Sequence, residues 1–176
     1  GAEVVKDRIK LDNNLGLLGV NIGPNKDTDD RLNDYLIGLK TFYEVADYIT
    51  INISSPNTEN LRNFHDESKL QELLKCISKK KNNLNSKIPI AVKISPDIHE
   101  DQINLISEIL LENEIKAIIV SNTSEATRDK LSNIQRHQKG GLSGKPIEKK
   151  SNILINKFHK LLKGKIKIIG VGGVDS

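Results

Sequence analysis

The chain has 176 residues, 36% of them hydrophobic, and its longest apolar run falls well short of the roughly 20 residues of a membrane-spanning helix, so the composition excludes a disordered protein and a transmembrane segment within this stretch. The net charge of +4 comes largely from lysines in helix-like segments, such as Lys79, Lys80 and Lys81, with no aromatic residues among them, which favours solvated helix ends over a nucleic-acid partner. The single cysteine, Cys76, cannot form an internal disulfide, which is consistent with a reducing, intracellular setting. It also lacks the neighbouring ligands of a metal site, so we expect no bound metal.

Helical and strand-like periodicities alternate along the chain. Helices are predicted for residues 2–11, 29–45, 68–78 and 100–113, and for a segment that begins near Pro146 and ends at Gly164. Strands are predicted for residues 17–23, from residue 48 onward, and for residues 87–95, 116–120 and 166–171. Residues 59–62 are predicted to form a polar loop, and residues 123–141 a long loop of the kind that often serves function.

This alternation predicts an α/β fold with parallel strands and right-handed crossovers. Two architectures compete, a (β/α)₈ TIM barrel and an open doubly wound sheet. No G-x-G-x-x-G fingerprint stands between a strand and a helix, which favours the barrel. Five strands do not close an eight-stranded barrel. Because the sequence also has no methionine and stops after a strand-like run, we expect a single barrel domain that is truncated at both ends.

The most informative stretch is the strand from Tyr48 and the run that ends it, Ser54-Ser55-Pro56-Asn57-Thr58. Pro56 has no N–H for a strand ladder, and serine and asparagine favour turns. The strand therefore delivers small polar side chains to its carboxyl end, where α/β folds keep their chemistry. The alternative interpretation is a polar turn that caps the next helix.

Other predicted strands end in polar or small residues as well, and in a barrel these ends surround one mouth. They are Asn21, Asn52, Lys93, Asn122 and Gly172. Lys93 follows the apolar run 90–92, and burying its charge there costs free energy unless a partner, such as a bound anion or an electron-rich ring, compensates it. Asparagine amides both donate and accept, which suits a planar ligand rich in heteroatoms, although asparagines at strand ends are also ordinary turn residues.

Two glycine runs add a candidate phosphate site. Gly140-Gly141-Leu142-Ser143-Gly144 precedes a predicted helix, whose free N–H groups would bind an anion. Gly172-Gly173 follows the last predicted strand and would let the backbone approach a ligand closely. Ordinary turn chemistry explains these glycines equally well.

On these residues the chain resembles the dihydroorotate dehydrogenases, and within them the quinone-dependent, membrane-associated class 2. The matching motifs occur in the family's order and cover nearly the whole chain. They are Gly19–Gly23, Asn52–Thr58 with Leu61 and Arg62, Val92–Asp97, Ser121–Thr123, Gly140–Pro146 and Ile169–Val174.

The resemblance implies an FMN-dependent enzyme of pyrimidine (UMP) biosynthesis that oxidises (S)-dihydroorotate to orotate and passes the electrons to a quinone. Ser55 stands at the position of the catalytic base, where the soluble class carries cysteine. The substrate would contact Asn52, Asn57, Asn122 and Thr123. FMN would contact Asn21, Asn52, Lys93, Ser121, Gly144 and Gly173. Because a serine hydroxyl is a weak base, we hypothesise that Thr58 and a water relay its proton.

The resemblance also implies membrane-binding helices and the first barrel strand before Gly1, and two further strands after Ser176, so the fragment alone is expected to be inactive. The whole protein would make peripheral contact with the inner membrane, on the cytoplasmic face in a bacterium or in the mitochondrion of a eukaryote. Two alternatives stay open: another flavin barrel that reduces a pyrimidine or uridine, and a non-catalytic barrel that binds a phosphorylated ligand.

Overall fold

The structure is a computed structural model that describes residues 1–12, 16–56, 61–125, 128, 131, 132 and 134–174. Within these residues five helices alternate with five strands. The helices are α1 (Ala2–Leu11), α2 (Arg31–Phe42), α3 (Glu67–Asn83), α4 (Glu100–Glu112) and α5 (Lys145–Leu162), joined by the short 3₁₀ helices η1 (Leu61–His65) and η2 (Ile134–His137). The strands are β1 (Gly19–Ile22), β2 (Tyr48–Asn52), β3 (Ile90–Lys93), β4 (Ala117–Val120) and β5 (Lys167–Gly170).

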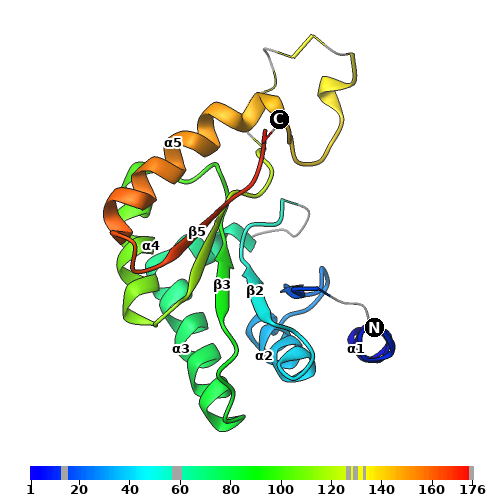
Figure 1. Ribbon diagram of the computed structural model, residues 1–176. Helices are drawn as coiled ribbons and strands as arrows, with labels where there is room; N and C mark the ends of the chain where they lie inside the picture. The colour runs from blue at the N-terminus through cyan, green and yellow to red at the C-terminus, as the bar shows by residue number, and fades with distance from the viewer. Residues whose placement is uncertain (13–15, 57–60, 126–127, 129–130, 133, 175–176) are drawn as a thin grey trace.

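The five strands form one parallel sheet whose spatial order, β1-β2-β3-β4-β5, follows their order in the chain (Figure 1). A doubly wound sheet reverses its strand order at a switch point, whereas a barrel adds each strand beside the previous one. The observed order is therefore the one that the barrel prediction requires. It also places the carboxyl ends of all five strands at the same end of the sheet.

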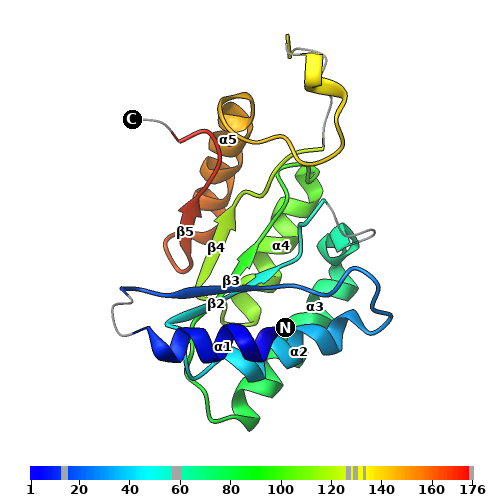
Figure 2. The same ribbon diagram turned by 90° about the vertical axis from the view of Figure 1, so that its right-hand side faces the viewer.

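Helices α2 to α5 cover one face of the curved sheet (Figures 1 and 2). Ile49 and Ile51 of β2, with Val92 of β3, belong to the buried core on that face. Because successive strand side chains point to opposite faces, the alternate residues Asn52 and Lys93 lie on the face away from the helices. Asn21 of β1, which precedes the core residue Ile22, lies on the same face. Three of the predicted site residues thus share one surface.

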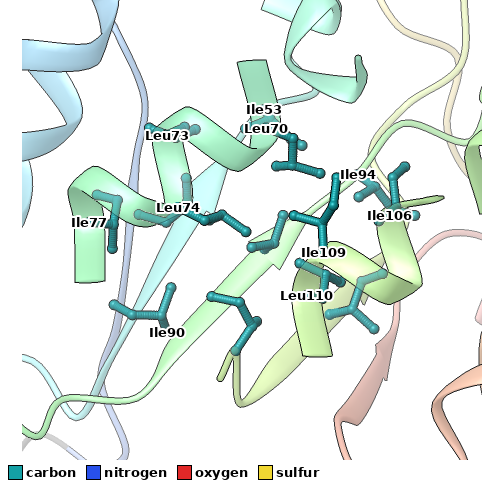
Figure 3. Packing of buried hydrophobic residues seen from close by; sticks show 14 of the residues in the cluster. Ile53, Leu70, Leu73, Leu74, Ile77, Ile90, Ile94, Ile106, Ile109 and Leu110 are labelled. Atoms are coloured by element: carbon teal, nitrogen blue, oxygen red, sulfur yellow. The ribbon is translucent and has the colours of Figure 1, made fainter. Parts of the chain in front are cut away.

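The core between the sheet and helices α3 and α4 is made almost wholly of leucine and isoleucine (Figure 3). Both helices bury residues spaced three or four apart, the spacing that places side chains on one helical face. Figure 3 shows these rows facing Ile90 of β3 and Ile94, which directly follows that strand. The rows are Leu70, Leu73, Leu74 and Ile77 from α3, and Ile103, Ile106, Ile109 and Leu110 from α4. They are the apolar stripes that the periodicity predicts.

Replacing Leu74 by alanine is expected to lower the free energy of unfolding by about 2–5 kcal/mol, because the side chain is 1% exposed and its loss leaves a cavity. Urea unfolding measures this change. The control is Ile37→Ala, at a helical residue that is 51% exposed, for which a change well below that of Leu74→Ala is expected. Equal effects of the two substitutions would contradict the assignment of Leu74 to the core.

Helix α1 occupies the predicted residues and packs beside α2 (Figure 1). It has no fully buried residue, and Val4 and Val5 are 52% and 47% exposed. Its contacts with the rest of the chain include an ion pair between Lys6 and Glu44 at 3.6 Å. Among the described residues, none of the helices combines the length and the apolar character needed to cross a bilayer.

Two expectations about local structure are wrong. The predicted polar loop at residues 59–62 gives way to η1 from Leu61 onward, because Leu61 and His65 are buried, at 1% and 2% exposure, and draw the backbone inward. Helix α3 continues to Asn83 rather than ending near Ser78. Several of the added residues, such as Lys79, Asn82 and Asn83, are exposed and polar, so the apolar period that predicts the helix gives no signal for them.

Candidate active site

The carboxyl ends of β2, β3 and β4 bring the predicted polar residues together. Asn52 and Lys93 are the last residues of neighbouring strands and are paired with each other in the sheet register. Asn122 follows β4, and its side-chain Nδ2 donates to Asn52 Oδ1 at 3.3 Å. All three side chains are half-buried. Residues that lie up to 70 positions apart in the sequence therefore converge at one place.

Ser54, which the sequence analysis places in the run after β2 without assigning it a role, connects this group. It is fully buried, and its hydroxyl lies 3.0 Å from Asn52 Oδ1 and 2.9 Å from the carbonyl oxygen of Lys93, either of which can accept its single proton. The same hydroxyl accepts from Asn122 Nδ2 at 3.0 Å. The Ser54 N–H also donates to Asn52 Oδ1 at 3.2 Å. Ser54 thereby fixes the orientation of both asparagine amides.

Ser55, the predicted base, follows Ser54 directly and is half-buried. Because the Ser54 hydroxyl contacts the Lys93 carbonyl, Ser55 and Lys93 belong to the same end of the sheet. The two other residues predicted for this loop, Asn57 and Thr58, lie outside the described residues.

Tyr35 of α2 is a second residue that the sequence analysis missed. Its ring is fully buried, and its hydroxyl donates to the carbonyl oxygen of Asn52 at 2.6 Å. Burial raises the pKa of Tyr35 far above its ordinary value, so the phenol remains a donor across the whole neutral range. The ring packs edge-on against Phe64 of η1. Tyr35 thus connects the end of β2 to the segment that follows it.

Asn21 lies farther out on this surface. It is exposed on β1, and its register partner is Thr50, which precedes Asn52 by two residues. Because β1 is at the edge of the described sheet, Asn21 borders the group around Asn52 rather than joining it.

The segment after β4 positions Ser121, Asn122 and Thr123. The Val120–Ser121 peptide is cis. Ser121 is buried, and its hydroxyl lies 3.2 Å from the Ser151 hydroxyl of α5, so it faces α5. The N–H of Thr123 donates to Asn122 Oδ1 at 2.8 Å, which gives the Asn122 amide a second fixed contact.

The two glycine runs meet at the amino-terminal end of α5, where Gly173 approaches Gly144 and Glu148. Gly144 is the N-cap of α5, and both Gly144 and Gly173 have a φ of 76°. A Cβ on Gly173 would come within 2.5 Å of Glu148 Cβ and 3.0 Å of the Gly144 carbonyl oxygen. Only glycine fits this narrow cradle, which lies at the amino-terminal end of α5.

Gly141, in the first of the two glycine runs, approaches Thr123 and Pro56 similarly closely. A Cβ there would fall 1.7 Å from Thr123 Oγ1 and 3.2 Å from Pro56. The neighbouring backbone is joined to β4's end by two hydrogen bonds between Ser124 and Leu142, at 2.7 and 2.9 Å. Gly141 therefore packs the glycine loop directly against the segment that carries Thr123.

A charged network centred on Asp97 connects the loops that follow β2, β3 and β4. Asp97 Oδ2 accepts from Arg62 Nη1 at 3.0 Å, and Oδ1 accepts from the Ser124 hydroxyl at 2.6 Å and from Lys150 Nζ at 2.5 Å. Arg62 also donates to the Thr123 carbonyl oxygen at 3.1 Å. These contacts hold the rim of the site at a fixed spacing.

Burial alone would raise the pKa of Asp97, but hydrogen bonds from Lys150, Ser124 and the Glu125 N–H outweigh it and hold the pKa below its ordinary value of 3.8. The folded state therefore binds the Asp97 proton more weakly than the unfolded chain does. It follows that the carboxylate stabilises the fold above about pH 5, and that this stability is lost as the pH falls through 3.8 towards the folded-state pKa.

Replacing Asp97 by asparagine is expected to lower the free energy of unfolding at neutral pH by on the order of 1 kcal/mol, a figure that allows for solvent screening at a partly exposed site. The difference from wild type should shrink below about pH 4, because protonation removes the same charge. Urea unfolding across this pH range measures it, with the exposed Asp7→Asn as the control. A difference that did not depend on pH would contradict the proposed role of the Asp97 charge.

The described residues contain no group of three or more histidine, cysteine, aspartate or glutamate side chains arranged to hold a metal ion. The side chains gathered around Asn52 are amides, a hydroxyl and the Lys93 ammonium group. Groups of these kinds form hydrogen bonds with planar organic ligands in proteins.

A family model described as dihydroorotate dehydrogenase matches residues 1–176. The chain is 44% identical to the quinone-dependent dihydroorotate dehydrogenase of Bartonella tribocorum over an alignment 179 residues long with its gaps, which covers 99% of this chain and 49% of that protein. It is 42% identical to the enzyme of the same name from Pasteurella multocida over an alignment 183 residues long with its gaps, which covers all of this chain and 54% of that protein. The chain thus spans about half the length of the curated relatives it matches.

The fold agrees with these similarities. A ligand-free dihydroorotate dehydrogenase from Eimeria tenella superposes with a TM-score of 0.93 at 30% sequence identity, over the whole of this chain and 55% of that one. The described strand order supports the predicted (β/α)₈ barrel arrangement, of which five strands are present here. The chain belongs to the dihydroorotate dehydrogenase family.

Proposed function

We propose that the protein containing this chain oxidises dihydroorotate to orotate, with FMN as its cofactor and a quinone as the final electron acceptor, in pyrimidine biosynthesis. The observation that carries the proposal is the convergence of Asn52, Lys93 and Asn122 beside Ser55 at the carboxyl end of the sheet. The names of the relatives, which are quinone-dependent dihydroorotate dehydrogenases, supply the substrate and the acceptor.

The residues of the site fit FMN. Amide groups and the Lys93 ammonium provide donors for the oxygen and nitrogen atoms of a flavin ring, and the cradle between Gly144 and Gly173 lies at a helix N-terminus suited to its phosphate. When bound, the flavin would accept a hydride from the substrate. We assign the flavin contacts to Asn21, Asn52, Lys93, Ser121, Gly144 and Gly173.

Ser55 is assigned the role of base, which removes a proton from C5 of dihydroorotate while C6 gives up its hydride. The ring and carboxylate of the substrate would be held by Asn52, Asn57, Asn122 and Thr123. A serine hydroxyl needs a path for the proton it receives, and Thr58 with a water is our candidate. The described contacts support the positions of Asn52 and Asn122, whose amides are held by Ser54.

We further infer that the whole protein makes peripheral contact with a membrane, because a quinone acceptor is dissolved in the lipid phase. The contact would come from residues outside this chain. The membrane would be the bacterial inner membrane at its cytoplasmic face, or the mitochondrial inner membrane in a eukaryote.

Anaerobic mixing of the purified full-length protein with dihydroorotate tests the function. We expect a yellow protein whose flavin absorbance is bleached by dihydroorotate and restored by a quinone. Bleaching by NADPH but not by dihydroorotate would favour a pyrimidine or uridine reductase instead. A colourless protein without flavin would favour the non-catalytic barrel.

A further inference from the structure

We propose that His65 is a positioning residue sensitive to pH, whose neutral imidazole holds η1 against the residues that follow β3. The positioning of Ser55 for catalysis rests on the proposed function above. The structural role of the imidazole does not depend on that function, and the two are tested separately below.

The two ring nitrogens of His65 contact groups of opposite hydrogen-bonding character. Nε2 lies 3.2 Å from the backbone N–H of Ser95 and must accept, whereas Nδ1 lies 2.7 Å from the carbonyl oxygen of Arg62 and must donate. Only the neutral tautomer with its proton on Nδ1 satisfies both contacts. A protonated ring would donate from both nitrogens and would place two donors face to face at Ser95.

Ser95 connects the imidazole to the site. It follows Ile94, whose carbonyl oxygen accepts from the backbone N–H of Asn122 at 2.9 Å. The Ser95 hydroxyl accepts from the N–H of Asp97 at 3.1 Å. Asp97 in turn binds Arg62 from the same 3₁₀ helix as His65. The imidazole and the Arg62–Asp97 pair are therefore two parallel connections between η1 and the end of β3.

Two held points flank Ser55 along the chain. Ser54 is buried on one side, and on the other side lies η1, with Leu61 1% exposed and Arg62 and His65 bound to the residues after β3. Loss of the contact between His65 and Ser95 would loosen η1 while Ser54 stays in place. We expect Ser55 to become less well positioned as a result, because catalytic geometry tolerates little displacement.

Burial favours the neutral form of His65. It lowers the pKa of His65 below its ordinary value of 6.5, and the positive charge of Arg62 adds to this, whereas the hydrogen bond to the Arg62 carbonyl and the negative charge of Asp66 oppose it. On the β3 side the nearest charged residue of the turn is Asp97, which is paired with Arg62 and Lys150. As the pH falls below 6.5, the unfolded chain takes up a proton that the folded chain does not, so the folded state loses stability until the folded-state pKa is reached.

Two variants separate the hydrogen-bonding role of the ring from its volume and its charge. His65→Gln keeps one donor and one acceptor and does not titrate, so it should restore the contacts without the pH dependence. His65→Ala leaves the Ser95 N–H and the Arg62 carbonyl without their partner and should be destabilised at every pH. All measurements use the full-length protein.

The first measurement is urea unfolding at about pH 7.5 and about pH 5.5, together with hydrogen exchange of the peptide that contains Ser95. Between these values the folding equilibrium constant of wild type should fall by up to about tenfold relative to His65→Gln. The protection factor of the Ser95 amide, which corrects for the intrinsic pH dependence of exchange, should fall in wild type only. Identical pH dependence in the two proteins would overturn the proposal. So would a His65→Ala variant as stable as His65→Gln at about pH 7.5.

The second measurement is flavin reduction by dihydroorotate over the same pH range. Across this range His65→Ala should be reduced about threefold or more slowly than wild type, and His65→Gln at close to the wild-type rate, because glutamine keeps the contacts of the neutral ring. Equal rates in wild type and His65→Ala would remove the link between His65 and Ser55. If wild type is not reduced by dihydroorotate at any pH, the proposed function fails, and the unfolding and exchange data still decide the role of the imidazole.

Discussion

Replacing Ser55 by alanine is expected to slow flavin reduction by dihydroorotate by about 10²–10⁴-fold, the range that a positioned general base contributes, while FMN stays bound. The alanine removes the hydroxyl that would take the C5 proton. It leaves in place Ser54, which holds the Asn52 and Asn122 amides through its own hydroxyl and N–H. Binding of flavin and orotate should therefore be nearly normal. Single-turnover stopped-flow absorbance of the full-length protein measures the rate.

The control for this variant is Ser68→Ala, which removes the same hydroxyl from an exposed position in the first turn of α3. Its reduction rate should match that of wild type. An unchanged rate in Ser55→Ala would remove Ser55 from the mechanism. Loss of flavin from Ser55→Ala would assign the residue to cofactor binding instead.

Replacing Lys93 by methionine is expected to slow flavin reduction by dihydroorotate by about 10²–10³-fold and to weaken FMN binding. Lys93 ends β3 beside Asn52, on the sheet face away from the helices, where its ammonium would stabilise negative charge that develops on the ring during hydride transfer. Methionine keeps most of the length and the apolar stem of the side chain and removes the charge together with its N–H donors. Stopped-flow reduction and fluorescence titration with FMN measure the two effects.

Lys167→Met provides a control of equal charge change. Lys167 starts β5 at the opposite, amino-terminal end of the same sheet and is exposed. We expect this variant to reduce its flavin at the wild-type rate. If Lys93→Met and Lys167→Met behaved alike, the effect would stem from net charge and the proposed local role of Lys93 would be wrong.

The sequence alone predicts the order and type of all five described helices and five described strands, because each has a clear apolar period and a turn signal at its end. The strands are long enough to be recognised from residues such as Ile49, Ile51 and Val92, which are buried where the alternation places them. Periodicity fails at η1, where a buried leucine and a buried histidine stand four residues apart in a polar context. That spacing carries too little signal to distinguish a short 3₁₀ helix from a loop.

The site is predicted where it depends on strand ends and missed where it depends on contacts between distant segments. Asn52, Lys93 and Asn122 are found because each ends or follows a strand, and parallel strands bring these ends together. Ser54 could have been found, since it lies two residues beyond Asn52 and so on the same face of the extended chain. Tyr35 and His65 offer no such signal, because their partners lie 17 and 30 positions away in the sequence.

A crystal structure of the full-length protein with FMN and orotate would test the central claim most directly, namely that separate strands surround one planar ligand. The account predicts orotate stacked on the flavin, with the Asn52 and Asn122 amides within hydrogen-bonding distance of it, Ser55 Oγ facing C5, and the Lys93 ammonium beside the flavin ring. Orotate bound elsewhere, or a flavin that contacts neither Lys93 nor Asn52, would contradict it.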